Sequence, residues 1–234
     1  EGTQLSQWVD MAKELRCSLI FDEFYSHYIY TGPTHGYPKM VSAAAYVDDV
    51  NQDPVVIVDG LTKNWRYPGW RISWTLAPKE VINTIASAGS FLDGGANNPF
   101  QKQVLELLDP EHVVDETIAT QRVFREKRDY LIKRLSRMGI LIDAEPTGTF
   151  YVWANLSKLP EPLNDGIKFF EAGLDEKVIT VPGAFFDVDP DRRRESGRYR
   201  AYARISFGPS METIVQGCDA LDRVIQRAKA GVAV

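Results

Sequence analysis

The first half of the chain combines a helical pattern with three apolar runs of strand length. Apolar residues recur at helical spacing between Leu5 and Leu15, as on one face of a helix. The runs that follow are short and rich in β-branched or aromatic residues. They are SLIFDE (18–23), VVIVDGL (55–61) and WRISWTLA (70–77). Strands that alternate with helices in this way predict an α/β layer sheet.

Two more helices are expected after the third run. The first extends from Lys79 to about Gly89, and its apolar residues share one face, as in an amphipathic helix. These residues are Val81, Ile82, Ile85 and Ala86. The loop DGGANNP then leads into a second helix, for which Asn98 is the expected N-cap and Pro99 the first helical residue.

A long charged amphipathic pattern runs from Glu116 to Met138 and stops at Gly139. Its expected buried residues are Ile118, Val123, Tyr130, Leu131, Leu135 and Met138. We expect this helix to lead from one domain, residues 1–114, into a second domain, residues 115–234.

The second domain shows three further strand-like runs and a final helix. The runs are FYVWANL (150–156), VITVPG (178–183) and YARISFG (202–208). Ser210 is the expected cap of the final helix. Helices and strands in this order predict a small α+β lobe.

Composition narrows the classes of protein. The chain has 234 residues, of which 44% are hydrophobic and 25% charged, as in a soluble globular protein. A formal net charge of −5 leaves no excess positive charge for nucleic acid or an anionic membrane surface. No stretch is apolar and long enough to span a bilayer. Cys17 and Cys218 match no metal or redox spacing, which favours a reduced pair in the cytoplasm.

The segment TKNWRYPGWR (62–71) is the most unusual part of the chain. Lys63 directly follows one strand, and Asp22 ends another. Ligands in open α/β sheets bind outside the carboxyl ends of strands, where both residues are expected. Taken singly, Lys63 reads as a solvated surface lysine and Asp22 as a turn residue. Together with Arg71 they offer an amine for a carbonyl cofactor, a carboxylate for a protonated pyridine and a guanidinium for a phosphate.

With these residues the chain resembles the class I and II aminotransferases, enzymes of fold type I that depend on pyridoxal 5′-phosphate. Three motifs of that family occur here in order: the lysine motif with an arginine eight positions later, an acidic strand end, and an Arg-Ile-x-Phe strand. The matching residues are Thr62, Lys63, Gly69 and Arg71; Asp22, Glu23 and Tyr25; and Arg204, Ile205 and Phe207. The resemblance implies an incomplete mixed sheet with helices, from the large domain, followed by the smaller C-terminal α+β domain.

The resemblance also implies a role for each matched residue. Lys63 would hold the cofactor as a Schiff base and later act as the base that moves a proton. Asp22 would keep the pyridine nitrogen protonated, and Tyr25 would bond the phenolic oxygen. Arg71 and Thr62 would bind the phosphate. Arg204 would grip the substrate carboxylate.

Three functions stay open on the sequence. The first is transamination between an α-amino acid and a 2-oxo acid. The second is other fold-type I chemistry, by a C–S lyase, a decarboxylase or a relative of the cyclopropane-carboxylate synthases. The third is a non-catalytic regulator domain that senses the cofactor.

The family's glycine-rich loop, stacking aromatic ring and asparagine motif are not in this sequence, so we expect a fragment that is inactive alone. The resemblance further implies a homodimer. Dicarboxylate-specific members carry an arginine from the neighbouring subunit near the segment corresponding to 91–98, and FLDGGANN has no basic residue. We therefore expect neutral or aromatic amino acids to be preferred as substrates.

Overall fold

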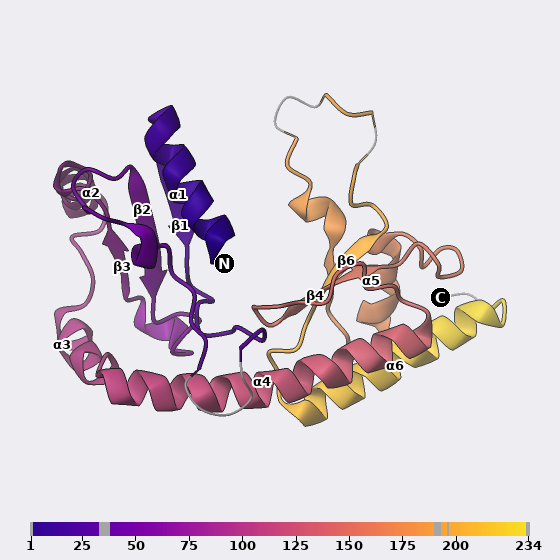
Figure 1. The fold of residues 1–234 in the computed structure, drawn as a ribbon. Coiled ribbons are helices and arrows are strands. Elements are labelled where there is room, and N and C mark those ends of the chain that lie inside the picture. Colours follow the sequence, from indigo (N-terminus) through magenta and orange to yellow (C-terminus); the bar gives the residue numbers. More distant parts are fainter. Residues whose placement is uncertain (1, 33–37, 190–192, 196, 233–234) are drawn as a thin grey trace. The chain divides into compact units, whose positions relative to one another are not determined.

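The computed structural model describes residues 2–32, 38–189, 193–195 and 197–232. The chain divides into two compact units, Glu1–Gln121 and Arg122–Val234, and each is described by itself. Figure 1 shows the order of the helices and strands along the chain. Within the described residues, no helix combines the length and the apolar character that crossing a membrane requires.

The first unit is built on a mixed sheet in the order β1-β2-β3. The strands are β1 (Leu19–Asp22), β2 (Val55–Gly60) and β3 (Ser73–Leu76). β1 and β2 are parallel, whereas β2 and β3 are antiparallel. The carboxyl ends of β1 and β2 and the amino end of β3 therefore meet at one edge of the sheet. The expected mixed sheet is confirmed.

Two apolar clusters hold this unit together. Helix α1 (Thr3–Leu15) buries Val9 in a cluster with Ala43, Val55 and Ile57, which packs it against the sheet (Figure 1). The second cluster lies beyond the sheet edge and joins helix α3 (Asn98–Leu107) to the segments that flank the turn after β2. Its buried members are Leu61, Trp65, Ile72 and Val104. The loop after β2 is thus anchored in a core of its own.

The two helices expected after β3 are both present, and the N-cap of the second differs from the prediction. Helix α2 (Lys79–Leu92) has its predicted apolar residues on the surface: Ile85 is 45% exposed, and no residue of the helix is buried. An amphipathic pattern identifies a helix but not whether another element of the described chain covers its apolar face. The N-cap of α3 is Asn97 rather than Asn98, because the side chain of Asn97 accepts the N–H of Phe100 at 3.1 Å.

Helix α4 (Pro110–Met138) begins six residues earlier than predicted and extends across the boundary between the units. Leu131, Leu135 and Met138 are buried as predicted. Ile118 and Val123 are 38% and 42% exposed, so the prediction that they are buried is wrong. In the first unit the buried positions of α4 are polar instead: Thr117, Thr120 and Gln121. Apolar periodicity misses this face because hydrogen bonds, such as that from Gln121 to the carbonyl oxygen of His27 at 3.0 Å, satisfy its polar groups.

The second unit contains an antiparallel sheet in the order β4-β6-β5. The strands are β4 (Tyr151–Asn155), β5 (Val181–Pro182) and β6 (Tyr202–Ser206), and the helices are α5 (Gly166–Asp175) and α6 (Met211–Lys229). Ser210 caps α6 as predicted, accepting the N–H of Thr213 at 3.2 Å. Helix α6 runs along the second part of α4 (Figure 1), where Arg134 pairs with Asp219 at 2.7 Å.

Candidate functional site

The sheet edge of the first unit gathers five of the six predicted site residues. Asp22 is the last residue of β1. Leu61, which follows β2, donates its N–H to the carbonyl oxygen of Ile72 at 3.0 Å, so the neighbouring residues Thr62 and Arg71 lie at the same end of the β2–β3 pair. Lys63 is the next residue after Thr62. The fifth residue, Tyr25, lies in the turns that follow β1.

The backbone around Lys63 forms a closed turn. The N–H of Tyr67 donates to the carbonyl oxygen of Leu61 at 3.0 Å, which closes the loop that carries Lys63. At the base of this loop, Gly60 allows β2 and β3 to approach each other closely, because a Cβ at residue 60 would lie 2.7 Å from the carbonyl oxygen of Ile72. Arg66 and Arg71 adopt left-handed backbone conformations, with φ of 62° and 57°. Two such non-glycine residues in six positions show that surrounding contacts dictate the shape of this segment.

Asn64 is the centre of a buried polar network beside Lys63. It is 1% exposed. Its Nδ2 lies 3.1 Å from the carbonyl oxygen of Glu23, 3.0 Å from Ser26 Oγ and 2.9 Å from Asp59 Oδ1. Its Oδ1 accepts the N–H of His27 at 3.1 Å. One side chain therefore joins the Lys63 turn to the loop after β1 and to the end of β2.

Asp59 is the acidic member of this network. Its Oδ1 also accepts the N–H of Gly60 at 2.6 Å. Burial is the main cause that raises the pKa of Asp59 to about 7; the neighbouring charges of Glu23 and Asp22 act in the same direction, and the hydrogen bonds from Gly60 and Asn64 oppose the rise. The carboxyl group can therefore hold a proton near neutral pH.

Two tyrosines connect the loop after β1 with the lysine. The hydroxyl of Tyr28, a residue only 1% exposed, donates to the carbonyl oxygen of Lys63 at 2.9 Å. The ring of Tyr25 packs edge-on against that of Tyr28, with centroids 6.2 Å apart. Tyr25 and Lys63 are half-buried, whereas Asp22 is exposed within the described chain and accepts the N–H of Phe24 at 3.4 Å.

Three neighbours of the turn are structural. His27 is 4% exposed and packs on Trp65, with ring centroids 4.6 Å apart. Burial, helped by the charge of Arg66, lowers the pKa of His27 to about 4, so the ring is neutral at pH 7. Arg66 binds Thr120 at 2.7 Å and forms an ion pair with Glu116, both on α4. The guanidinium of Arg66 is therefore bound by side chains of α4.

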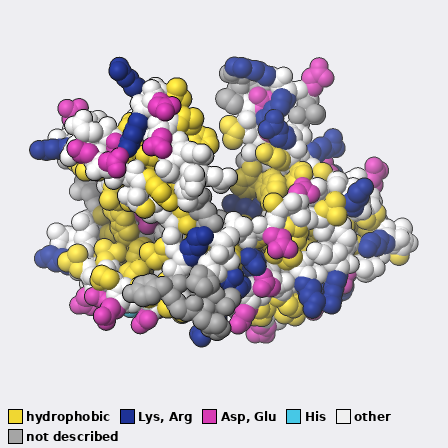
Figure 2. Space-filling view, in the orientation of Figure 1, with side chains coloured by type: hydrophobic (Ala, Val, Ile, Leu, Met, Phe, Trp, Pro, Cys, Tyr) yellow, Lys and Arg dark blue, Asp and Glu magenta, His cyan; other side chains and the backbone are white. Residues whose placement is uncertain are grey.

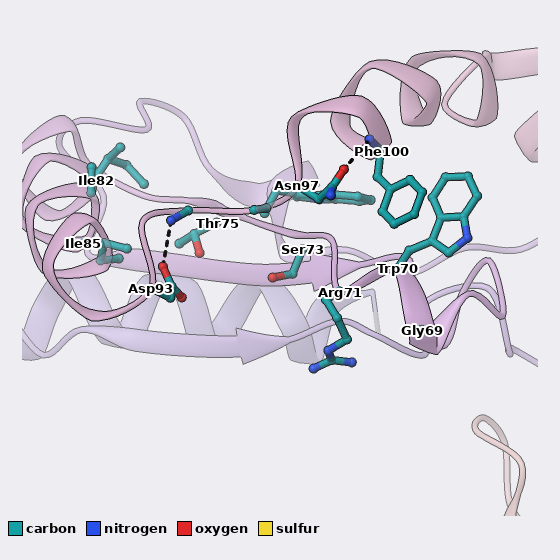
Figure 3. Close-up of a pocket in the computed structure, with 14 residues that line it drawn as sticks. Gly69, Trp70, Arg71, Ser73, Thr75, Ile82, Ile85, Asp93, Asn97 and Phe100 are labelled. Atoms are coloured by element: carbon teal, nitrogen blue, oxygen red, sulfur yellow. Dashed lines mark hydrogen bonds between the residues drawn. The ribbon is translucent and has the colours of Figure 1, made fainter.

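Arg71 lies on the exposed side of the hairpin. It follows the short helix η2 (Pro68–Trp70), and its Nη1 donates to the carbonyl oxygen of Pro68 at 2.9 Å. An open pocket of about 720 Å³ adjoins it, lined by residues of η2, β3, α2 and the loop before α3. Figure 3 shows Trp70 stacked on Phe100 at one end of the pocket and Arg71 pointing away from both rings. The guanidinium is accessible to an anion.

Arg204, the sixth predicted residue, lies in β6 of the second unit. Its guanidinium carbon is 4.2 Å from the ring centroid of Tyr151 and 4.8 Å from that of Phe186. Its Nε is buried and has no hydrogen-bond partner in the part of the chain that the structure describes. Rings pack against the guanidinium, and a carboxylate can be bound only along its edge.

The donor set suits pyridoxal 5′-phosphate by its chemistry. The edge offers an amine for a carbonyl carbon, carboxylate and phenol groups for ring substituents, and a hydroxyl and a guanidinium for a phosphate. Among the described residues, no group of three or more His, Cys, Asp and Glu side chains is arranged to hold a metal ion. Acidic and basic side chains are interspersed on the visible face of each unit in Figure 2, without a broad basic patch.

Sequence reasoning missed Asn64, Asp59 and Tyr28. Asn64 directly follows Lys63, and an amide in such a turn is ordinarily a solvated residue. Its burial depends on acceptors from residues 23–26, far away in sequence, which periodicity cannot reveal. Asp59, a charged residue inside the run VVIVDGL, was the one available signal, because a carboxylate in a buried strand requires partners.

Comparison with known proteins shows the family of the chain. The model of the family "Aminotransferase class I and II" matches residues 3–221. A probable aspartate/prephenate aminotransferase of Aquifex aeolicus is 26% identical over 97% of this chain and 53% of its own length. The aspartate/prephenate aminotransferase of Thermus thermophilus is 28% identical over 90% of the chain and 48% of its own length. The chain spans about half the length of these relatives.

Solved structures agree as well. The Thermus thermophilus aspartate aminotransferase with maleate has a TM-score of 0.78 at 25% identity, over 96% of this chain and 52% of that one. The aromatic aminotransferase of Pyrococcus horikoshii, at 23% identity, shares the fold, with a TM-score of 0.81 over 98% of this chain and 56% of that one. With a family match over nearly the whole sequence, this chain belongs to the class I and II aminotransferases.

Proposed function

We propose that this chain is the later half of a pyridoxal-5′-phosphate-dependent aminotransferase, which moves an amino group between an α-amino acid and a 2-oxo acid. The observation that carries the proposal is the convergence of Asp22, Tyr25, Thr62, Lys63 and Arg71 at one sheet edge. Five residues with the required chemistry would not be expected to share one edge by chance.

Each residue at the edge has a proposed task. When bound, the cofactor supplies an electron sink for the carbanion formed at the substrate Cα. Asp22 holds a proton at the pyridine nitrogen, and Tyr25 donates to the phenolic oxygen. Thr62 and Arg71 bind the phosphate. The Lys63 amine would hold the cofactor and, once the substrate amine has displaced it, would be free to move a proton at the substrate Cα.

Arg204 is the proposed site for the substrate carboxylate. The rings of Tyr151 and Phe186 pack against the guanidinium, whose N–H groups lie in one plane because the group itself is planar. A carboxylate can accept two parallel hydrogen bonds in that plane. This fixes the orientation of the substrate, which decides which bond to Cα is broken.

The resemblance supports two further parts of the proposal, a homodimer and a role in amino-acid metabolism, and the spacing of Cys17 and Cys218 supports a cytoplasmic location. It also supports the expectation of neutral or aromatic substrates, because residues 91–98 contain no basic side chain. The relatives described above are named for aspartate and prephenate. A full-length protein with aspartate as its best amino donor would refute the expectation.

The test uses the full-length protein that carries this chain, supplied with the cofactor and a panel of amino acids and 2-oxo acids. Transamination predicts equal amounts of new amino acid and new 2-oxo acid, without ammonia. Ammonia release would identify a lyase, and carbon dioxide release a decarboxylase. Cofactor binding without any turnover would identify a sensor domain.

A further inference from the structure

We propose that Asn64 is the positioning residue for Lys63, and that Asp59 holds its amide in place. The inference rests on the proposed function, in which Lys63 must meet the same cofactor as Asp22 and Tyr25. These residues come from two segments about 40 positions apart in the sequence, and a feature of the fold has to set their spacing. The network around Asn64 is that feature.

The contacts of Asn64 run to both segments. Three partners belong to residues 23–27, the loop that carries Tyr25 and directly follows Asp22: the carbonyl oxygen of Glu23, Ser26 Oγ and the N–H of His27. The fourth, Asp59 Oδ1, belongs to the strand that leads to Lys63. The Asn64 amide has two N–H groups and three nearby acceptors, so one of the N–H groups is shared between two acceptors.

Other residues also hold the Lys63 turn, but they do not replace the hydrogen bonds of Asn64. Tyr28 reaches the carbonyl oxygen of Lys63 at 2.9 Å, which fixes one end of the turn. Trp65 donates to the carbonyl oxygen of Leu107, and Arg66 donates to Thr120 of α4, so both residues also tie the turn to later parts of the chain. The ring contact between His27 and Trp65 also joins the turn to the loop after β1. Asn64 differs from these neighbours because its one side chain bonds to Glu23, Ser26 and His27 together, at the residue next to Lys63.

Asp59 makes the orientation of the amide unambiguous. Its Oδ1 accepts from both Gly60 and Asn64, so the Nδ2 of Asn64 faces Asp59 and its Oδ1 faces the His27 N–H. A carboxamide reversed in this position would place two oxygens against each other. Because the network is buried, an unpaired group in it costs more than an exposed one.

The experiment uses the full-length protein and four variants. Asn64→Ala removes every contact, and Asn64→Asp keeps the shape and the acceptor for His27 but loses the N–H donors. Asp59→Asn keeps an oxygen that accepts from Asn64. Asn155→Ala is the matched control in the second unit, where the Asn155 amide binds Asp143 at 3.1 Å and 3.0 Å.

The first measurement needs no cofactor. Hydrogen exchange of residues 23–28 should become at least tenfold faster in Asn64→Ala, stay close to wild type in Asp59→Asn and be unaffected by Asn155→Ala. The second is the rate at which borohydride traps pyridoxal 5′-phosphate on Lys63, compared at equal folded fraction. It should fall at least tenfold in both Asn64 variants and remain within about twofold in Asp59→Asn and Asn155→Ala.

Each outcome decides the inference. Faster exchange with an unchanged trapping rate in the Asn64 variants would show that Asn64 only stabilises the fold, and would overturn the positioning role. Unchanged exchange would overturn the network itself. Absence of trapping on Lys63 in the wild type would refute the proposed function and, with it, this role of Asn64. If Asn64→Ala does not fold, hydrogen exchange of residues 23–28 and the trapping rate on Lys63 are measured in Asn64→Asp instead, and they decide the inference.

Discussion

Lys63 and Arg204 are held in place by opposite means. The turn of Lys63 is fixed by hydrogen bonds, from a buried amide and a tyrosine hydroxyl. Arg204 is fixed by two aromatic rings, and its Nε has no hydrogen-bond partner among the described residues. A hydrogen-bonded turn sets the position of a backbone, whereas ring packing sets the plane of a side chain and leaves its donors for a ligand.

The difference fits two kinds of task. A residue that forms a bond and moves a proton depends on position to within a fraction of an ångström. A residue that recognises a carboxylate depends on unsatisfied donors in the right plane. The two sites should therefore respond differently to substitution: variants at the first should alter the rate of the chemical step, and variants at the second substrate binding.

Lys63→Ala should have the largest effect. Without the amine, turnover should fall by at least about a hundredfold, because general base catalysis contributes roughly 10²- to 10⁴-fold. The cofactor should still bind non-covalently, since Asp22, Thr62 and Arg71 remain. Steady-state kinetics and equilibrium dialysis with the full-length protein measure the two effects. Turnover equal to wild type would remove Lys63 from the chemistry.

Arg204→Lys should come next. Lysine keeps the charge but loses the planar fork, so substrate binding should weaken by about 2–3 kcal/mol, while cofactor affinity changes little. The measurement is KM for amino donor and acceptor, beside a cofactor titration. Loss of the cofactor with unchanged substrate affinity would contradict the assigned role.

Asp59→Asn tests the polar network through stability. The pKa of Asp59 is raised by folding from 3.8 to about 7, so the folded state keeps a proton that the unfolded state has lost. Wild-type stability should therefore fall as the pH rises from 4 to 7, and the variant should escape this loss. The full pKa difference corresponds to about 4 kcal/mol, and partial exposure reduces it to about 2 kcal/mol.

Urea unfolding of wild type and Asp59→Asn between pH 4 and pH 8 measures this difference. The contribution of His27 to the pH dependence cancels, because His27 titrates in both proteins. Asp53→Asn is the control of opposite sign. Burial would raise the pKa of Asp53, but hydrogen bonds from the Asp48 N–H and Lys13 outweigh it and lower the pKa. That variant should lose stability at neutral pH. A pH-independent gap between wild type and Asp59→Asn would contradict the raised pKa.

Phe186→Leu should have the smallest effect. Leucine fills much of the space but cannot attract the guanidinium, and cation–π contacts contribute roughly 0.5–2 kcal/mol. KM for the amino donor should rise a few-fold at unchanged kcat, with thermal stability as the control. An effect as large as that of Arg204→Lys would mean that the ring touches the substrate itself.

The sequence predicts much of the fold, because strand runs and helix periods are local properties. All six runs contain strands, and the Ser210 cap is confirmed. What it does not predict depends on contacts distant in sequence. Ile118 is exposed because the buried positions of α4 in the first unit are polar; Val123, in the second unit, is exposed as well, and no residue of α2 is buried.

The candidate site divides in the same way. Lys63, Asp22 and Arg204 were accessible to reasoning because each follows or lies in a recognisable strand beside chemically suitable neighbours. The supporting residues Asn64, Asp59 and Tyr28 were not. Their roles arise from hydrogen bonds between the loop after β1 and the turn after β2, and no local pattern records those bonds. The assigned roles of the six site residues stay predictions until tested.

The central claim is that Lys63 is the residue to which pyridoxal 5′-phosphate is attached. The most direct measurement is borohydride reduction of the cofactor-bound full-length protein, followed by proteolysis and mass mapping of the labelled peptide. The account predicts a single stable adduct on Lys63, in the peptide that contains Thr62 and Asn64. An adduct on any other lysine, with Lys63 unmodified, would contradict it.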